Sequence, residues 1–401
     1  MKNILILPNR VLAAGACASV IMFLFLWNFS GGMFAKFFPA LQYNAADVAP
    51  AHIAPVLPPP PRHISTPTPV RALYMTSWVA GTPSLREQLV DFIKISEINA
   101  IVIDIKDYTG KVSFLTDNLA IQEMGSEEKR IADMGEFIQT LHKHGIYVIG
   151  RISVFQDPHV VSRKQEIAVH KKDGSVWKDR KGITWVDPAS EVMWEYIVEI
   201  GRVSERMGFD ELNFDYVRFP SDGNMENISY PVWDGKKSRS DVLENFFAYL
   251  DIHLHNVGVP ISFDLFGMTM TNTDDLNIGQ VLEKAVPYAD YIAPMVYPSH
   301  YPSGWNNISN PAASPYEVIN YVMKEGAQRL EVMRLSATST SSPLYGKEFA
   351  KLRPWIQDFD LGATYTADMI KKEKQAVYDA GLDSWMVWDP KNIYTREAYT
   401  E

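Results

Sequence analysis

Apolar segments of strand length alternate with helix-like segments from residue 71 almost to the end of the chain. This alternation constrains the fold strongly, because strands joined by helices form only a few architectures. About eight strand-helix units predict a (β/α)₈ TIM barrel, an α/β fold, over residues 71–401. A doubly wound open sheet needs fewer strands and usually a glycine-rich first turn, which the sequence lacks. The predicted strands are 71–78, 100–107, 147–155, the start of 208–222, 259–268, 291–297, 352–359 and 384–389.

Amphipathic patterns predict the helices that join these strands. Each lies between two strand segments, as the crossover connections of a parallel sheet require. The pattern of 328–340 is ambiguous, and Asp275 is expected to cap the helix that it begins. The predicted helices are 84–93, 133–144, 190–207, 240–256, 275–288, 315–326 and 366–380.

The N-terminal region carries an uncharged, almost wholly apolar run over residues 11–29. A helix of this length crosses a bilayer. Lys2 and Arg10 precede the run, so the positive-inside rule places the N-terminus in the cytoplasm and the rest outside. We therefore expect a cytoplasmic tip and membrane anchor over 1–37, with the barrel in the periplasm or at the cell surface. The alternative is a signal peptide that is cleaved, leaving a secreted protein.

Residues 38–70 are rich in proline among small residues and predict an extended linker between the membrane and the barrel. Cys17 is the single cysteine and lies inside the apolar run. The exported part therefore has no disulfide, thiol nucleophile or thiolate metal site, and must be stabilised by a large core.

Charge and motif content exclude several classes of partner. The net charge is −10 and the isoelectric point about 5.5, which does not indicate a nucleic-acid partner. No GxxxxGK[ST] or GxGxxG motif is present, so a nucleotide site is not expected. No HExxH or GxSxG motif is present either, which gives no sign of a zinc hydrolase or a serine nucleophile. We expect no cofactor and no bound metal.

The stretch 208–222 contains a strand with a polar face. Glu211, Asn213 and Asp215 share one parity and therefore point to the same side of the strand. Leu212 and Phe214 point to the other side. Buried polar groups are costly unless they are hydrogen-bonded or used in function. Asp215 is thus either a catalytic carboxylate or one that pairs with Arg218 or Arg151 to stabilise the barrel.

The active site of a TIM barrel lies at the C-terminal ends of the strands. Carboxylates and aromatic side chains dominate these positions, a mixture that suits a glycosidic bond flanked by two carboxyl groups and sugar rings that stack on aromatic faces. The structural alternatives are a turn role for Asp107, a loop-closing role for His300, and core positions for Trp185 and Trp388. The predicted catalytic residues are Asp215, Asp264 and Asp358, and the predicted substrate-binding residues are Asp104, Asp107, Arg151, Arg218, Tyr297, His300, Trp185 and Trp388.

Several motifs together resemble the bacterial putative glycosyl hydrolase domain family, which is related to the α-amylase-type barrel glycosidases. They include VRALYMTSW, AIVIDIKD, GFDELNFDYVRFPSDG, ISFDLFG, YIAPMVYPSHY and LRPWIQDF, and they extend from about residue 71 to 394. The resemblance implies that Asp215 is similar to the α-amylase-type nucleophile. It implies that Asp264 stands where such enzymes carry an acid Glu, and that Asp358 is similar to their third carboxylate.

The fourth strand also resembles the DxxDxDxE motif of chitinases, through Asp210, Asn213 and Asp215. The middle Asp of the motif is Asn213 here, and its acid Glu is Val217. The resemblance therefore does not extend to the substrate-assisted chemistry of chitinases.

These observations predict a membrane-anchored glycoside hydrolase that cleaves a polysaccharide outside the cytoplasm. Asp215 would act as nucleophile or base, and Asp264 as general acid with a pKa raised by burial and a neighbouring carboxylate. Arg218 or Arg151 would keep Asp215 ionised. The alternatives are a non-catalytic carbohydrate-binding or cell-envelope scaffold protein, favoured by the absent Glu, and a metal-dependent hydrolase using Asp side chains with His300.

Overall fold

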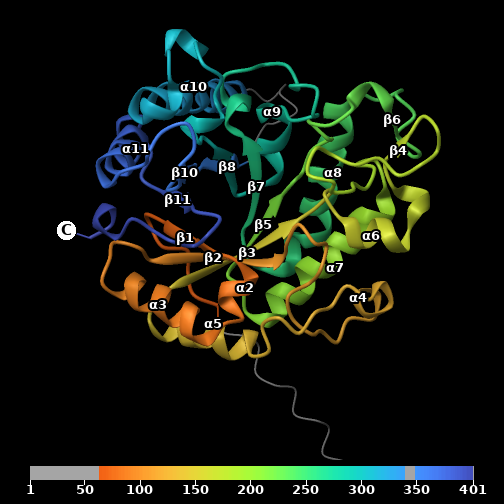
Figure 1. Cartoon of the computed structure of the whole chain (residues 1–401), viewed down its shortest axis with the longest axis horizontal. Coiled ribbons are helices and arrows are strands. Elements are labelled where there is room, and N and C mark those ends of the chain that lie inside the picture. Colours follow the sequence, from red (N-terminus) through yellow and green to blue (C-terminus); the bar gives the residue numbers. More distant parts are fainter. Residues whose placement is uncertain (1–62, 339–347, 401) are drawn as a thin grey trace, which may run out of the picture. The chain divides into compact units, whose positions relative to one another are not determined.

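Parallel strands close into a barrel in the order in which they occur in the chain (Figure 1). The computed structural model describes residues 63–338 and 348–400. Within them, β11 pairs with β1, which completes the ring. The predicted α/β barrel is therefore confirmed. The strands of the ring are β1 (Arg71–Met75), β2 (Ala100–Lys106), β3 (Tyr147–Ser153), β5 (Glu211–Asp215), β7 (Ile261–Phe266), β8 (Tyr291–Met295), β9 (Lys351–Leu352), β10 (Trp355–Gln357) and β11 (Trp385–Trp388).

The seventh position of the barrel is divided between two short strands. β8 pairs with β9 through Ile292 and Leu352, and with β10 through Met295 and Trp355. Pro354 lies in the gap, and proline has no backbone N–H to donate to a ladder. The single strand predicted at 352–359 is thus interrupted, and its second part re-enters the barrel with Trp355 facing inward.

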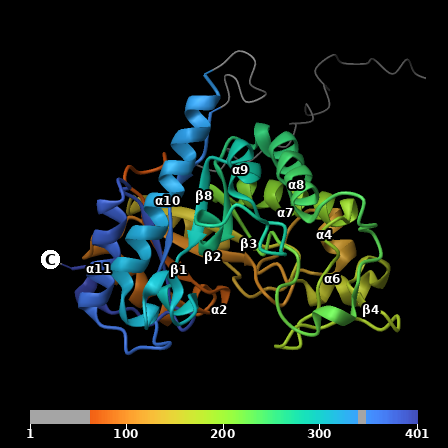
Figure 2. The same ribbon diagram turned by 90° about the horizontal axis from the view of Figure 1, so that it is seen from above.

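Two long excursions leave the C-terminal side of the barrel, one after β3 and one after β5. They meet in a small antiparallel sheet in which β4 (His170–Lys171) pairs with β6 (Ile228–Ser229). Figure 2 shows β4 and α6 (Pro158–Arg163) on the opposite side of the barrel from α10 (Pro315–Ser336) and α11 (Ala367–Asp379).

Helices surround the strands on the outside of the barrel (Figure 1). The long helix α7 has Ser190 as its N-cap and ends at Gly208, which has a left-handed backbone. The helices are α2 (Ser77–Ala80), α3 (Pro83–Lys94), α4 (Leu119–Met124), α5 (Met134–Lys143), α6 (Pro158–Arg163), α7 (Glu191–Met207), α8 (Arg239–Leu254), α9 (Leu282–Ala285), α10 (Pro315–Ser336) and α11 (Ala367–Asp379).

The prediction of a helix at 275–288 is wrong for the first half of that range. Leu276 and Asn277 have φ values of 51° and 56°, and two consecutive left-handed residues cannot belong to a right-handed helix. Asp275 accepts a hydrogen bond from the Asn277 amide within this turn instead of capping a helix. Only α9 and a short 3₁₀ turn form further along, whereas the ambiguous segment after 328 continues α10 to Ser336.

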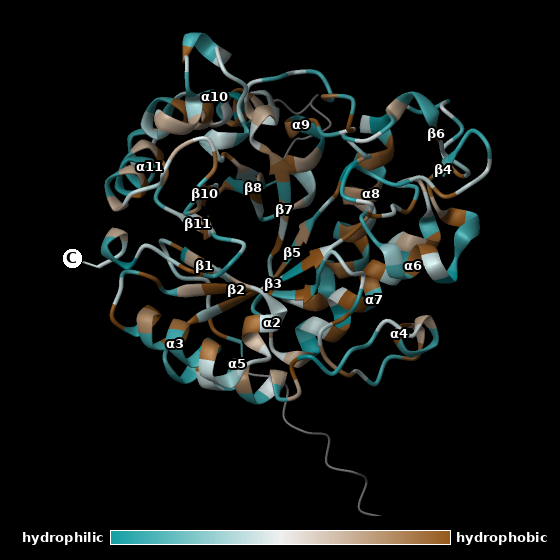
Figure 3. Ribbon diagram, viewed as in Figure 1, coloured by the Kyte–Doolittle hydropathy of each residue, from teal (hydrophilic) through white to brown (hydrophobic). Residues whose placement is uncertain are grey.

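Two apolar layers result from the alternating side-chain directions of the strands. Leu212 and Phe214 of β5 belong to the outer layer, between the strands and the helices. The inner layer fills the barrel and includes Val102, Ile149 and Trp355. Figure 3 shows hydrophobic residues concentrated along the central strands and on one side of the surrounding helices. Glu211, Asn213 and Asp215 point into the barrel, so its interior holds a column of polar groups.

The N-terminal end of the barrel contains a buried ion pair. Glu211 and Arg353 form this pair with no exposure of either side chain to solvent. The hydroxyl of Ser262 also donates to Glu211 over 2.6 Å. This pair lies at the start of β5, at the opposite end of the strand from Asp215.

The segment 63–69, which precedes β1, crosses this end of the barrel. The Ile64 amide donates to the Asp210 carboxylate over 2.9 Å, and the Thr66 hydroxyl donates to Tyr147 over 3.0 Å. His63 and His142 also lie against Asp210, with ring nitrogens 3.6 and 2.8 Å from its oxygens. The part of the predicted linker nearest the barrel is therefore bound to it.

The predicted anchor at 1–37 and the linker up to residue 62 lie outside the described residues. None of the helices in the described ranges has the length and apolar character needed to cross a membrane.

Candidate active site

A cavity of about 530 Å³ opens at the C-terminal ends of the strands. Its walls come from the segments that follow β5, β7, β8, β10 and β11, together with Lys181 from the excursion after β3. This is the end of a TIM barrel where active sites lie. The predicted site residues that line it are Asp215, Arg218, Tyr297, His300 and Trp388.

Asp215 ends β5 and is bound by the guanidinium of Arg151 from the neighbouring strand β3. Nε of Arg151 lies 3.1 Å from Oδ2 of Asp215, and Nη2 donates to the same oxygen. The other side of the guanidinium donates to Asp104 over 2.7 Å, and Tyr74 donates its hydroxyl to Asp104 over 2.6 Å. Asp104 therefore orients Arg151, and Arg151 fixes Asp215. Such charge-assisted hydrogen bonds are stronger than neutral ones, so they hold the Asp215 side chain in one position.

Asp264 stands beside Asp215 on the adjacent strand β7. The two residues directly follow Phe214 and Phe263, which pair in register, and both point into the barrel. Oδ1 of Asp264 accepts hydrogen bonds from Asn213 over 2.9 Å and from the Trp355 indole over 2.8 Å. Oδ2 is buried and has no partner among the described residues.

The environment of Asp264 favours its protonated form. Burial, followed by the negative charge of Asp215, raises the pKa of Asp264 to about 8. The hydrogen bonds from Asn213 and Trp355 oppose this change, since they favour the charged form, but they are the smaller effect. Near pH 7 the two neighbouring carboxyls are thus a protonated Asp264 and an Asp215 paired with Arg151.

The depth of the two carboxyls differs. Asp215 is 3% exposed and lines the cavity, whereas Asp264 is 1% exposed and does not line it. Asp264 is therefore the more deeply buried of the two. The hydroxyl of Tyr297 is also buried without a partner in the described chain, and burial together with the charges of Asp264 and Asp215 raises its pKa.

Aromatic rings form one wall of the cavity. Trp388 stacks on Tyr74 with ring centroids 5.0 Å apart and meets the Tyr297 ring edge-on at 6.0 Å. His300 packs against Tyr297, and burial followed by the charge of Lys181 lowers its pKa, so its ring is neutral at pH 7. Such a wall offers flat apolar surface with polar edges, which suits a sugar ring.

The backbone turns sharply directly after Asp215. Tyr216 has a φ of 55°, a left-handed conformation that is uncommon for a bulky residue and occurs most often at functional sites. Its amide donates to Asp215. The turn also sends Val217 into the outer apolar core, so the position where a chitinase carries its acid faces away from the cavity.

A protein-family model described as "Putative glycosyl hydrolase domain" matches residues 72–394. The chain belongs to this family. The family assignment supports a glycosidase, as the motifs predict. No curated protein matches the chain.

Among solved structures, a hypothetical protein from Ruminiclostridium thermocellum shares 35% identity; the match covers 48% of this chain and 96% of that one, with a TM-score of 0.44. The glycoside hydrolase domain of PgaB (BpsB) from Bordetella bronchiseptica shares 14% identity over 83% of this chain and 99% of that domain, with a TM-score of 0.58. An alpha-L-fucosidase from Paenibacillus thiaminolyticus shares 11% identity over 83% and 47% of the two chains, at 0.50. The last two likenesses show the fold alone.

Asp358 of this glycosyl hydrolase domain lies away from the other predicted catalytic residues. Its carboxylate accepts hydrogen bonds from the Thr395 amide at 2.9 Å, the Thr395 hydroxyl at 2.8 Å and the Tyr399 hydroxyl at 2.9 Å. Trp355 and Gln357 face the barrel interior, so Asp358 falls on the outward side. The structure therefore gives it the role of holding the C-terminal segment.

Asp107 also lies outside the cavity. It binds Arg130 over 2.6 Å and the amide of Thr109 over 3.0 Å, as expected for the turn alternative. Trp185 is fully buried, so it presents no ring to the cavity and belongs to the core. Its indole donates to Asp179 over 3.0 Å.

Asn213 and Trp355 contact Asp264 but were absent from the predicted set. For Asn213 the signal was present, because it shares the parity of Asp215 on a strand already identified. Trp355 also belongs to the predicted seventh strand, but the interruption at Pro354 hides that it faces inward.

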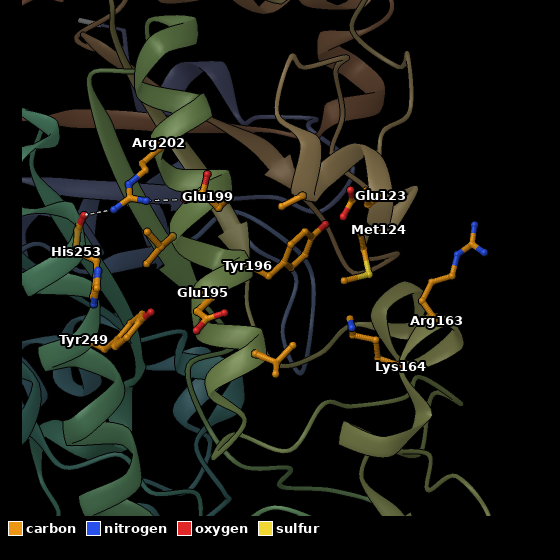
Figure 4. Close-up of a pocket in the computed structure, with 13 residues that line it drawn as sticks. Glu123, Met124, Arg163, Lys164, Glu195, Tyr196, Glu199, Arg202, Tyr249 and His253 are labelled. Atoms are coloured by element: carbon orange, nitrogen blue, oxygen red, sulfur yellow. Dashed lines mark hydrogen bonds and ion pairs between the residues drawn. The ribbon is translucent and has the colours of Figure 1, made fainter. Parts of the chain in front are cut away.

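A second hollow of about 760 Å³ lies on the helical shell and not at the strand ends (Figure 4). Figure 4 shows Tyr249 and His253 on one side of it and Arg163 and Lys164 on the other. Both acidic and basic side chains line it, and Arg202 pairs with Glu199 at 2.6 Å. In residues 63–338 and 348–400, no group of three or more His, Cys, Asp or Glu side chains is placed to hold a metal ion.

Proposed function

We propose that this chain is a glycoside hydrolase that cleaves a polysaccharide, with Asp264 as the general acid and Asp215 as the nucleophile or general base. One observation carries the proposal: a carboxyl with a raised pKa and an unpartnered oxygen stands beside a carboxylate held by an arginine. Two carboxyl groups in unlike environments are the arrangement that glycosidic bond cleavage uses.

Asp215 reaches the cavity directly and is positioned to act on the anomeric carbon or on a water molecule. Asp264 lies deeper, so its proton reaches the glycosidic oxygen only if the bound sugar approaches the floor of the cavity. In the described chain, Oδ2 of Asp264 and the hydroxyl of Tyr297 have no hydrogen-bond partner, which leaves hydrogen-bonding capacity at this floor. Geometry in the absence of substrate is often looser than in the complex.

The test uses the full-length protein with a panel of cell-wall and exopolysaccharides, and measures the release of reducing ends. Asp215→Asn and Asp264→Asn are each expected to lower kcat by about 10²- to 10⁴-fold. Asp274→Asn, an exposed residue outside the cavity, is the matched control and is expected to retain full activity. Undiminished hydrolysis of a true substrate by either active-site variant would refute the assignment.

The depth of Asp264 favours a second function, saccharide binding without hydrolysis. In that case the wild-type protein binds one of the polysaccharides, and no member of the panel is cleaved. Binding is expected to depend on Trp388 in either case, whereas release of reducing ends separates the two functions.

The same proposal places the enzyme outside the cytoplasm, anchored by residues 11–29. It rests on the uncharged apolar run and the preceding Lys2 and Arg10. Exposure of the C-terminal part to protease added to intact cells or to spheroplasts tests the location. Recovery of the whole protein in the membrane fraction, at its full mass, distinguishes an anchor from a cleaved signal.

A further inference from the structure

Arg218 is a buried guanidinium on the wall of the cavity, and it has no carboxylate partner among the residues that the structure describes. Its side chain is buried, at 8% exposure for the residue, yet it lines the cavity. Nη1 donates to the Phe219 carbonyl over 3.2 Å and to the Ser221 hydroxyl over 3.0 Å. Among the described residues, Nε and Nη2 have no hydrogen-bond acceptor, and no carboxylate lies within 4.0 Å of the group. Buried charges are normally paired, so this one calls for an explanation.

Three aromatic rings hold the guanidinium in place. It lies 4.7 Å from the Trp185 ring, 5.3 Å from Tyr216 and 4.9 Å from Phe266. These rings stabilise a cation without neutralising it. The Nε and Nη2 edge has no acceptor in the described chain, so it can bind an anion through two parallel hydrogen bonds.

A second cation faces the same space from the excursion after β3. Lys181 is exposed and lines the cavity, and its ammonium has no carboxylate within 4.0 Å in the described chain. Its charge reaches His300 on the other wall, where it helps lower the pKa of that ring. The positive charge of Lys181 therefore acts across the cavity.

Three acidic residues act on Arg218 through their charge, Asp215, Asp222 and Asp179, and in the described chain none of them forms an ion pair with it. Asp179 accepts hydrogen bonds from the amides of Lys181 and Ile183, both at 2.9 Å, and from the Trp185 indole. Asp215 is bound by Arg151. His300 is neutral at pH 7. A chain with a net charge of −10 thus has, among its described residues, two cations without an ion-pair partner beside its candidate catalytic carboxylate.

We propose that the cavity binds a sugar unit carrying an anionic substituent, and that Arg218 and Lys181 bind that substituent. The substrate is then an anionic polysaccharide with carboxylate, sulfate or phosphate groups. This inference rests on the glycosidase function proposed above and names its substrate class. A guanidinium fork recognises carboxylate and phosphate oxygens in a planar, bidentate manner, whereas a neutral sugar leaves the buried charge unpaired.

The test measures binding of the full-length protein to matched pairs of polymers by affinity electrophoresis. Polygalacturonate is compared with its carboxyl-reduced form, dextran sulfate with dextran, and phosphorylated mannan with mannan. At least one anionic polymer is expected to bind about tenfold or more tightly than its neutral partner. The pair that shows the difference identifies the anion, and added salt is expected to weaken the binding.

Two variants test whether the two cations cause the preference for the anionic polymer. Arg218→Gln and Lys181→Met are each expected to lose most of this preference. Lys172→Met is the matched control, because this exposed lysine belongs to the same excursion but does not line the cavity. Lys181 is exposed, so its variant tests the inference even if Arg218→Gln fails to fold. Equal binding of both members of every pair by the wild-type protein would overturn the inference.

Hydrolysis of the same polymers separates this inference from the proposed function. Binding of an anionic polymer that depends on Arg218 and Lys181, without hydrolysis, upholds the inference and refutes the enzyme. Hydrolysis of a neutral polysaccharide that depends on Asp215, with kcat/KM unchanged in Lys181→Met and Arg218→Gln, upholds the enzyme and refutes the inference.

Discussion

Trp355 donates its indole N–H to Oδ1 of Asp264 over 2.8 Å, inside the barrel and below the cavity. The two residues come from strands that are separated by β8 in the ring. This hydrogen bond favours the charged form of Asp264, so it moderates the effect of burial on the pKa of the carboxyl.

Replacing Trp355 with Phe removes this donor and keeps an aromatic ring. The pKa of Asp264 is expected to rise further, which moves the alkaline limb of the pH–kcat profile upward by about one unit. Trp385→Phe is the matched control, because its indole donates to Tyr378 over 3.0 Å and not to the site. An alkaline limb that stays in place in Trp355→Phe would show that the indole does not tune Asp264.

The activity is expected to fall on the alkaline side of about pH 8. A general acid acts only while it is protonated, and the pKa of Asp264 is about 8. Above that pH, kcat/KM should therefore drop by about tenfold per pH unit. Initial rates between pH 5 and pH 10 on a substrate of the panel provide the measurement. A flat profile from pH 7 to 9.5 would exclude Asp264 as the acid.

Asp264 is also expected to reduce the free energy of unfolding at neutral pH. Its folded-state pKa of about 8 exceeds its ordinary value of 3.8. Between these values the folded protein binds more protons than the unfolded chain, so stability falls as pH rises from about 4 to about 8. Asp264→Asn removes this pH dependence. In urea unfolding, the free energy of unfolding of the variant should therefore increase relative to that of the wild type as pH rises from about 4 to about 8.

Asp133 supplies a control of opposite sign for this measurement. Its pKa is lowered, first by the hydrogen bond from Arg86, so its contribution is present above pH 3.8 and lost as pH falls through the lower folded value. Asp133→Asn is therefore expected to lose a little stability at neutral pH. A loss of similar size in Asp264→Asn would contradict the prediction.

The ion pair of Glu211 and Arg353 provides a stability test that leaves the cavity untouched. Arg353→Met leaves Glu211 as an unpaired buried charge, and we expect a cost of about 3–5 kcal/mol. The double variant Glu211→Met with Arg353→Met removes both charges and should be close to the wild type. Chemical denaturation gives both values, and a double variant as unstable as the single one would refute the explanation by an unpaired charge.

His63 is expected to make the binding of segment 63–69 depend on pH. The Asp210 carboxylate, whose Oδ1 lies 3.6 Å from Nδ1 of the ring, is the largest cause of the raised pKa of His63, and the hydrogen bond with Glu205 adds to it. The stabilisation is thus complete below about pH 6.5 and lost as pH rises through the raised value. As pH rises across that range, hydrogen exchange of the Ile64 amide should accelerate more in the wild type than in the His63→Gln variant. His142 also faces Asp210, so His142→Gln is the necessary comparison.

The barrel and the neighbouring positions of Asp215 and Asp264 could be predicted from the sequence. Long apolar runs mark the strands, and side-chain alternation places polar residues on one face. Asp215 ends its strand and Asp264 lies two residues before the end of the next strand, so the two are close. The strand at 147–155, for instance, differs from β3 by two residues at its end.

The errors arise where one residue changes the local backbone. Leu276 and Asn277 break a helix that the pattern predicts, and nothing in their types demands a left-handed conformation. Pro354 divides the seventh strand, which hides that Asp358 faces outward. The choice between Arg151 and Arg218 as the partner of Asp215 depends on the turn at Tyr216. These are tertiary contacts, so they cannot be predicted from the pattern of residues along the chain.

The segment 63–69 decides where this protein can be shortened. A truncated protein that starts at Arg71 matches the first strand, yet it lacks Ile64 and Thr66, which donate to Asp210 and Tyr147. At the N-terminal end of its barrel, the Asp210 carboxylate and the Tyr147 ring would be exposed, although the segment otherwise covers them. A catalytic fragment for crystallisation or assays should therefore begin ahead of His63.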